Sequence, residues 1–310
     1  MRIIRSIQEL TELSIPSAVA IGNFDGLHKG HITLIKDMVD YANNHTLTPT
    51  ILTFDPMPEE YFKTNNFFKV MGSEEKIKFF KDLNIKQLII IPFDKSFSEI
   101  DADVFIKNIL ITKIKSRYIV VGDDFKFGHK RKGDIDLLES YAMKGNFELT
   151  KIRLIKSLDK KVSSSNIRQL LIQGKIKEAN RILLSPFSIS GKVIHGEKKG
   201  RELGYPTANI EICNSYPING IFLTRVYSRT IDGYYGLSSL GNKPTFSGTN
   251  NVLETFIFDF ESEIYGETMR VLFLEKLRDQ IKFKSADELI DQMNKDYNLA
   301  IELKRNKYGL

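Results

Sequence analysis

The sequence predicts two domains: an α/β domain built on a parallel sheet, then an all-β domain that closes into an antiparallel barrel and ends in a helix. Over residues 1–184, short apolar runs alternate with segments of helical periodicity. This alternation is typical of a parallel sheet with helices on both faces. Over residues 185–310, short β-rich segments follow one another between glycines, which favours a barrel. A chain of 310 residues is long enough for both domains.

Composition narrows the class of protein only partly. A formal net charge of +6 suits anionic small molecules as well as nucleic acid. A single cysteine excludes an intrachain disulfide and a multi-cysteine metal cluster. The N-terminal segment lacks a signal-peptide pattern, and no run approaches the ~18 apolar residues of a membrane span. We expect a cytoplasmic protein that does not bind a membrane, and a monomer or weak homo-oligomer.

Three polar motifs follow predicted strands of the first domain. Strands are expected at residues 18–21, 48–56, 86–93, 117–122 and 147–154, with helices from residues 30, 73, 101 and 134. The motifs "GNFDGLHKGH", "TFDPMP" and "GDDFKFGHKRKG" come after the first, second and fourth of these strands. Because ligands of parallel sheets bind beyond the carboxyl ends of the strands, we expect these motifs to form one site.

The segment from Ala18 to Met38 organises the first domain. Its apolar run breaks at Gly22 and resumes as a helix, with His28 and His31 where the helix begins. Backbone N–H groups at a helix N-terminus attract phosphate, and two imidazoles there suit a polyphosphate. An ordinary turn with surface histidines is the simpler interpretation of any single residue, whereas the whole string favours a binding site.

A second helix start lies at "VSSSNIRQLL", from Val162. Serines before an apolar run are typical N-cap residues, and capping alone explains them. Arg168, about one turn into the helix, would make the same place an anion clamp. From the residues alone both interpretations stay open. This helix is expected to end at Gly174, with a short second one before the domain boundary near Leu184.

The second domain is expected to form strands at 188–196, 207–212, 220–241, 252–260 and 269–278, with a hairpin signal at Asp232-Gly233 and a final helix from Ser285. The final helix has one apolar face and is interpreted as a packing helix. Glycines and basic residues at 196–201 predict a cationic flap.

Candidate ligand groups of this domain are Thr207, Asn209 and Glu254. Thr207 and Asn209 point the same way in an extended segment, and their oxygens suit Mg²⁺ carried by a nucleotide, although both residue types are also common in turns. Glu254 interrupts an apolar strand pattern. It either faces solvent or acts as a base on an alcohol.

The first-domain motifs resemble the nucleotidyltransferase superfamily, whose marks are a His-x-Gly-His turn and a Ser-Ser-Thr/Ser-x-x-Arg helix start. The strings "FDG", "TFDPMP" and "GDDFKFG" narrow the resemblance to the adenylyltransferase module of bacterial bifunctional riboflavin kinase/FAD synthetases. Met57 stands where that family more often has His, and Ser165 replaces the commoner Thr. Neither change removes a charged group. The implied fold is a Rossmann-like parallel sheet.

The resemblance implies adenylyl transfer from ATP to FMN. His28, His31 and Arg168 would be catalytic. The ATP-binding residues would be Gly22, Asn23, Phe24, Asp25, Gly26, His28, His31, Ser163, Ser164 and Arg168, and the flavin-binding residues would be Phe54, Pro56, Asp124, Phe125 and Phe127. The phosphate of FMN is largely dianionic at neutral pH because its second pKa is about 6. No general base is therefore needed, and stabilising the leaving pyrophosphate is the main task.

The second-domain motifs resemble the riboflavin kinase module, through "G-x-V-x-H-G", "G-R-x-L-G-Y-P-T-A-N", "NKPTF", Glu254 and "DFESEIYG". The implied fold is a riboflavin-kinase-like barrel. Glu254 would be the base, and Thr207 and Asn209 the ligands of Mg–ATP. The ATP-binding residues would be Gly191, Val193, His195, Gly196, Lys199, Gly204, Pro206, Thr207 and Asn209. The expected ligands are Mg²⁺, ATP, riboflavin and FMN, with FAD as the final product.

Three other functions compete with this interpretation. The chain could be an FMN adenylyltransferase whose barrel only senses flavin. It could be a nucleic-acid-binding protein that uses its positive charge and small barrel, but then neither set of motifs would be needed, so we expect no nucleic-acid partner. A class I aminoacyl-tRNA synthetase shares the histidine–glycine turn. It ranks lowest because its lysine-rich second signature is missing from the sequence.

Overall fold

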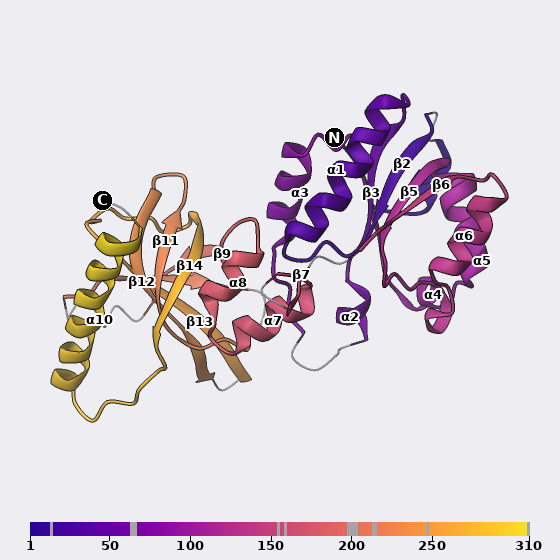
Figure 1. The fold of residues 1–310 in the computed structure, drawn as a ribbon. Coiled ribbons are helices and arrows are strands. Elements are labelled where there is room, and N and C mark those ends of the chain that lie inside the picture. Colours follow the sequence, from indigo (N-terminus) through magenta and orange to yellow (C-terminus); the bar gives the residue numbers. More distant parts are fainter. Residues whose placement is uncertain are drawn as a thin grey trace. The chain divides into compact units, whose positions relative to one another are not determined.

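The computed structural model describes residues 1–12, 15–62, 67–153, 156–157, 160–196, 204–212, 216–245 and 248–308. The chain packs as two compact units. The first comprises Met1–Phe67 and Ser73–Ser164, and the second Phe68–Gly72 and Ser165–Leu310. The first unit holds a parallel sheet and the second a closed barrel (Figure 1), which confirms the predicted fold class.

The sheet of the first unit has the strand order β1-β4-β3-β2-β5-β6, and all its pairs are parallel. Its strands are β1 (Arg2–Ile4), β2 (Ser17–Ile21), β3 (Thr48–Phe54), β4 (Gln87–Ile91), β5 (Ser116–Gly122) and β6 (Glu148–Ile152). The sequence did not predict β1, because three residues at a sheet edge carry no readable periodicity. A small two-stranded sheet pairs β7 (Lys156–Ser157) with β8 (Lys160–Lys161).

Helices cover both faces of this sheet (Figure 1). They are η1 (Gln8–Glu12), α1 (Lys29–Asn44), α2 (Pro58–Tyr61), α3 (Ser73–Asp82), α4 (Lys95–Ser98), α5 (Ala102–Val104), η2 (Phe105–Lys113), η3 (His129–Arg131) and α6 (Ile135–Met143). The helix expected from residue 101 is mostly a π-helix, η2. Side chains of β2 alternate between the faces: Val19 and Ile21 join the core beneath η2 and α6, and Ala18 and Ala20 point to the opposite face, where α1 packs on β2.

The sheet brings the three polar motifs of the first unit to one edge. Strand β2 lies between β3 and β5, and the chain reverses its direction of strand addition at this point. The carboxyl ends of these strands are therefore neighbours at the topological switch point of the sheet, where ligands of such folds bind. The Gly22 amide donates to the Leu52 carbonyl over 3.1 Å, which ties the first turn to β3.

The barrel closes in the order β10-β13-β12-β11-β14-β9, and every pair is antiparallel. The elements are β9 (Ser188–Ile194), β10 (Thr207–Glu211), β11 (Gly220–Tyr227), β12 (Asp232–Thr245), β13 (Gly248–Ile257) and β14 (Thr268–Arg278), with α7 (Ser164–Ile172) and α8 (Ile176–Ile182) before them and α10 (Ala286–Lys307) after them. Asn180 of α8 donates to the Phe273 carbonyl and accepts from the Phe187 amide, both over 2.8 Å. These bonds fasten α8 to the barrel.

Among the described residues with buried side chains, the barrel interior is apolar except for a row of hydroxyls. Thr224, Ser238 and Thr255 are fully buried, and each neighbouring pair of hydroxyl oxygens lies 2.8 Å apart. On the outside, Arg278 of β14 makes a bidentate ion pair with Asp296 of α10, at 2.6–3.0 Å. This pair fixes α10 to the barrel wall, which confirms that α10 is a packing helix.

Candidate active sites

The first candidate site is the turn between β2 and α1. His28 is the N-cap of α1, and its Nδ1 accepts from the His31 backbone amide over 3.3 Å. The two imidazole rings stack with centroids 3.6 Å apart, tilted by 14°. Phe24, whose φ is +50°, packs edge-on against the His31 ring at 5.2 Å. The sequence placed the histidines at the helix start, and the structure shows that they also form its cap.

Both histidines are neutral in this site. Burial lowers the pKa of His28 to about 4. Burial lowers the pKa of His31 well below its usual 6.5, and electrostatic repulsion from the protonated form of His28 and from the Lys76 ammonium lowers it further. Because the His28 Nδ1 accepts the capping bond, its proton sits on Nε2. The pair therefore offers N–H donors to an anion, together with the partial positive charge of the helix N-terminus, rather than two formal cations.

The second motif reaches the first through Ser164. Its hydroxyl donates to the Asp25 carbonyl over 2.7 Å, so the first residue of α7 is bonded to the turn before α1. Asp25 itself is fully buried, and Ser163 directly precedes the helix. Arg168, one helical turn after Ser164, belongs to the second unit. Its side chain is buried, and its Nε donates to the Phe68 carbonyl over 2.9 Å.

The predicted flavin residues fall into two groups. Phe54 and Phe127 are buried members of the core cluster, and Phe125 packs against the same cluster. Phe125 and Phe127 stack with centroids 5.3 Å apart. Asp124 is exposed and Pro56 half-buried. Phe54 and Phe127 therefore belong to the hydrophobic core of the first unit, while Asp124 and Phe125 are more exposed.

Aromatic side chains missed by the sequence analysis extend this region. Phe62 is 63% exposed although it is a large apolar side chain. Its ring lies 5.1 Å from Tyr61 and 5.9 Å from Phe93, and Phe93 packs on Phe54 at 6.0 Å. Exposed aromatic rings at a binding edge offer a stacking surface. The string "EEYF" directly after "TFDPMP" was the signal that could have identified them.

The second candidate site lies on the outer face of the barrel. Asn209 of β10 is directly opposite Glu254 of β13 in the register, which places their Cβ atoms about 5 Å apart on the same face. Thr207, two residues before Asn209, shares that face. Leu253 and Thr255 are fully buried in the barrel interior, so Glu254 between them faces outward. The structure thus brings together the three side chains that the sequence singled out.

Two glycines of this site allow close approach. A Cβ on Gly196 would lie 2.1 Å from Nδ2 of Asn209, and a Cβ on Gly191 would lie 2.0 Å from the Glu211 carbonyl oxygen. Real atoms do not approach so closely, so a larger residue at Gly191 displaces the β10 backbone, and one at Gly196 displaces the Asn209 side chain. The chain segment around residue 196 therefore passes directly over the Asn209 amide. This contact gives a structural reason for part of the "G-x-V-x-H-G" motif.

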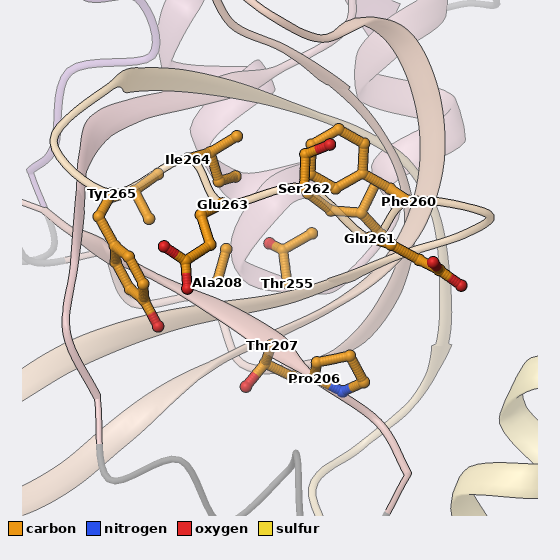
Figure 2. A pocket seen from close by; sticks show the side chains of 12 residues that line it. Pro206, Thr207, Ala208, Thr255, Phe260, Glu261, Ser262, Glu263, Ile264 and Tyr265 are labelled. Atoms are coloured by element: carbon orange, nitrogen blue, oxygen red, sulfur yellow. The ribbon is translucent and has the colours of Figure 1, made fainter.

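A pocket of about 270 Å³ opens beside this face, between Pro206–Ala208 and the loop 260–265. Val193, Thr255 and Ile257 also line it. In Figure 2 the Glu263 carboxylate points toward the strand that carries Thr207 and Ala208, whereas Glu261 points away from it. Glu263 was not among the predicted residues, although "DFESEIYG" contains it.

The ring of His195 stacks on Tyr265 at the edge of this pocket, with centroids 3.8 Å apart. Gly204 is exposed, with a φ of +81°. Lys199, with the rest of the predicted cationic flap beyond residue 196, lies outside the described residues.

The donor set fits a nucleotide-borne magnesium ion better than a resident metal centre. Within the described residues there is no group of three or more His, Cys, Asp or Glu side chains that could hold a metal ion. The Thr207 hydroxyl, the Asn209 amide oxygen and the Glu254 carboxylate are hard oxygen donors on one face. Mg²⁺ prefers such oxygens and retains water and phosphate ligands, so few protein ligands suffice.

Two family models match the chain in the order of its two folds. The model described as FAD synthetase matches residues 11–166, and the model described as riboflavin kinase matches residues 183–304. The α7–α8 segment lies mostly between the two matches. The sheet and the barrel, each with its own cluster of candidate site residues, define a two-domain transferase of flavin biosynthesis.

Relatives that match over nearly their whole length specify the family. A Buchnera aphidicola protein (subsp. Schizaphis graminum), named bifunctional riboflavin kinase/FMN adenylyltransferase, is 38% identical over 97% of this chain and 98% of its own. An Escherichia coli K12 protein of the same name is 31% identical, with 97% of each chain covered. The chain belongs to the bifunctional riboflavin kinase/FMN adenylyltransferase family.

A solved structure from Streptococcus pneumoniae has the same fold along the whole chain. It is 30% identical, covers 99% of both chains and gives a TM-score of 0.86. It carries the name macrolide-efflux protein. In the described part of the present chain, no helix is long and apolar enough to cross a membrane.

Proposed function

We propose that the chain carries out two consecutive ATP-dependent steps, phosphorylation of riboflavin to FMN at the barrel and adenylylation of FMN to FAD at the turn before α1. The observation that carries this proposal is the presence of two separate sets of groups with different chemistry. The outer face of the barrel presents carboxylate, amide and hydroxyl oxygens around Glu254. The turn before α1 presents N–H donors at a helix N-terminus.

In the kinase step, the 5′-hydroxyl of riboflavin attacks the γ-phosphorus of ATP. A bond forms between the hydroxyl oxygen and phosphorus, the bond from phosphorus to the β–γ bridging oxygen breaks, and ADP leaves. Glu254 takes the hydroxyl proton, because an alcohol is a poor nucleophile until it loses that proton. Thr207 and Asn209 would hold the Mg²⁺ that accompanies ATP, and this ion would supply positive charge to the transferred phosphoryl group.

In the adenylyl-transfer step, a phosphate oxygen of FMN attacks the α-phosphorus of ATP. The bond from that phosphorus to the α–β bridging oxygen breaks, and pyrophosphate leaves. The His28 and His31 imidazoles, the backbone N–H groups of the turn and the Ser163 hydroxyl stabilise the negative charge that develops on the leaving group. The Ser164 hydroxyl holds the turn in place through the Asp25 carbonyl. Arg168 is proposed for the same role from the motif "SSSNIR". The rings of Phe62 and Phe93 offer the isoalloxazine a stacking surface.

The boundary between the two activities is proposed near Leu184, with residues 1–184 for adenylyl transfer and 185–310 for the kinase. The two family-model matches are compatible with this boundary, since the FAD synthetase match ends at residue 166 and the riboflavin kinase match begins at residue 183. We also propose a cytoplasmic location, as expected for an enzyme that uses ATP and produces flavin cofactors, and a monomer or weak homo-oligomer.

A product time course tests the proposal. Purified protein with riboflavin, ATP and Mg²⁺ should form FMN first and FAD later, as separated by chromatography. If FAD forms from supplied FMN but riboflavin is never consumed, the barrel is a flavin-binding module without kinase activity. If neither product forms, the proposed function is wrong.

A further inference from the structure

Lys76 is a buried lysine beside the first site that no motif identified. It lies on α3 and is 8% exposed. Among the side chains whose exposure the structure describes, Lys76 and Arg168 are the buried Lys and Arg residues. Moving an ammonium group out of water costs several kcal/mol unless its surroundings compensate. A lysine in this position therefore needs an explanation that an ordinary helix surface does not supply.

The α3 helix presents Lys76 directly to the turn before α1. The Lys76 ammonium donates to the Asn23 carbonyl over 3.1 Å. The same carbonyl accepts from the Thr53 hydroxyl at 3.3 Å. One helical turn after Lys76, Phe80 packs edge-on against Phe24 at 5.8 Å. Two contacts from α3 therefore fix two consecutive residues of the turn.

The charge of Lys76 also reaches the histidine pair. It contributes to lowering the pKa of His31, which shows that the ammonium lies within electrostatic range of that ring. His28 cannot supply the positive charge without breaking its capping bond, because protonation of Nδ1 removes the acceptor. Lys76 is a fixed cation at this turn that does not depend on the histidines.

We propose that Lys76 is a positioning residue of the adenylyl-transfer site, which holds the Asn23 turn in place and supplies fixed positive charge toward the polyphosphate of ATP. The inference rests on the proposed adenylyl transfer by the first unit. A buried cation in a dry site acts more strongly on an anion than an exposed one, because water screens it less. The sign of the effect is the one that a pyrophosphate leaving group requires.

Binding of inorganic pyrophosphate and of adenosine to the full-length protein separates charge from shape. In Lys76→Met, pyrophosphate should bind about tenfold more weakly or worse, as expected when a charge-assisted interaction is lost. Adenosine, which carries no phosphate, should bind as it does to the wild type. Lys76→Arg should recover most of the pyrophosphate affinity. Lys78→Met, the same change at an exposed position of the same helix, should leave both affinities unchanged.

Steady-state kinetics provide a second test of the role of Lys76. With FMN and ATP, Lys76→Met should raise the KM for ATP about tenfold or more, while riboflavin phosphorylation by the same preparation stays at the wild-type rate. An unchanged kcat for FAD formation at saturating ATP serves as the folding control of the first unit. NMR of the His31 ring should show its pKa moving up toward 6.5. The inference is overturned if pyrophosphate affinity is unchanged in Lys76→Met, or if adenosine and pyrophosphate weaken equally. Because binding needs no turnover, these outcomes are distinct from a failure of adenylyl transfer itself.

Discussion

The two candidate sites present opposite kinds of polar group. The turn before α1 offers donors: the N-terminus of a helix, the neutral imidazoles of His28 and His31, and the Lys76 ammonium. The outer face of β10 and β13 offers acceptors, with Asn209 opposite Glu254. The difference follows the nucleophiles. A phosphate is already deprotonated, so its site needs hydrogen-bond donors that offset its negative charge. An alcohol needs an acceptor that takes its proton.

The largest expected effect comes from a substitution that impairs only the acceptor site on β10 and β13. Replacing Glu254 by Gln keeps the size of the side chain but removes the base, so riboflavin phosphorylation should fall by about 100-fold or more. Adenylylation of supplied FMN should continue at the wild-type rate, measured by chromatography of FAD. A Glu254→Gln protein that still phosphorylates riboflavin normally would show that Glu254 is not the base.

The next largest effect is expected from a substitution that impairs only the donor site at the turn before α1. In His28→Ala both the N-cap and an imidazole donor are lost. FAD formation should fall about 100-fold, because one preorganised donor is missing, while FMN accumulates from riboflavin. The free energy of unfolding should also fall by about 1 kcal/mol from the lost cap.

His28→Asn separates these two losses, since Asn is a good N-cap. This variant should unfold like the wild type in a denaturant titration and still form FAD slowly. Full adenylyl-transfer activity in His28→Asn would contradict a role for the imidazole beyond capping.

A smaller effect is expected from Gly196→Ala. The new Cβ would meet the Asn209 side-chain amide at 2.1 Å, so this side chain must leave the position in which it faces Glu254. Small displacements of positioning groups are costly, and the kinase rate should fall about tenfold or more, with FAD formation from FMN unchanged. Gly72→Ala is the control, because nothing lies within 4 Å of the position its Cβ would take. An active Gly196→Ala kinase would show that the Asn209 position is not critical.

The smallest effect is the pH dependence of the stability of the first unit, which tests whether the histidines of the donor site are neutral. The pKa of His28 is about 4 in the folded protein and near 6.5 when unfolded. Between these values the unfolded chain binds more protons, so the stabilising contribution is present above pH 6.5 and is lost as the pH falls toward 4. The free energy of unfolding of the first unit should be about 2 kcal/mol lower at pH 5 than at pH 7 because of this residue. In His28→Asn that part of the pH dependence should disappear.

How far the sequence predicted each region depends on how local the signal is. The β2–turn–α1 unit is local: glycines, histidines and helical periodicity lie within about one element of each other, and the structure confirms the strand, the turn and the helix. The barrel is also recognisable, because each strand repeats the same alternation. The π-helix η2 was expected as an ordinary helix, since its apolar residues follow nearly the same spacing.

Burial was not predictable, because it depends on partners distant in the sequence. Lys76 resembles any exposed lysine of an amphipathic helix until Asn23, 53 residues away, is placed beside it. The neutral state of the histidines has the same origin: their positions were expected, but the loss of charge follows from packing. Phe54 and Phe127 were assigned to flavin by motif, and the tertiary core that buries them lies outside the motif.

The segment Phe68–Gly72 makes the connectivity of the two units discontinuous in sequence. It packs with the barrel unit, although the residues before and after it belong to the sheet unit. Within it, Phe68 accepts the Arg168 guanidinium bond and packs on the rings of Phe187 and Tyr216, at 6.5 and 5.7 Å. No single cut in the gene therefore yields both units intact. A fragment beginning at residue 185 lacks the Phe68 ring, and one ending at residue 164 lacks Arg168, so each fragment loses contacts that are present in the full chain.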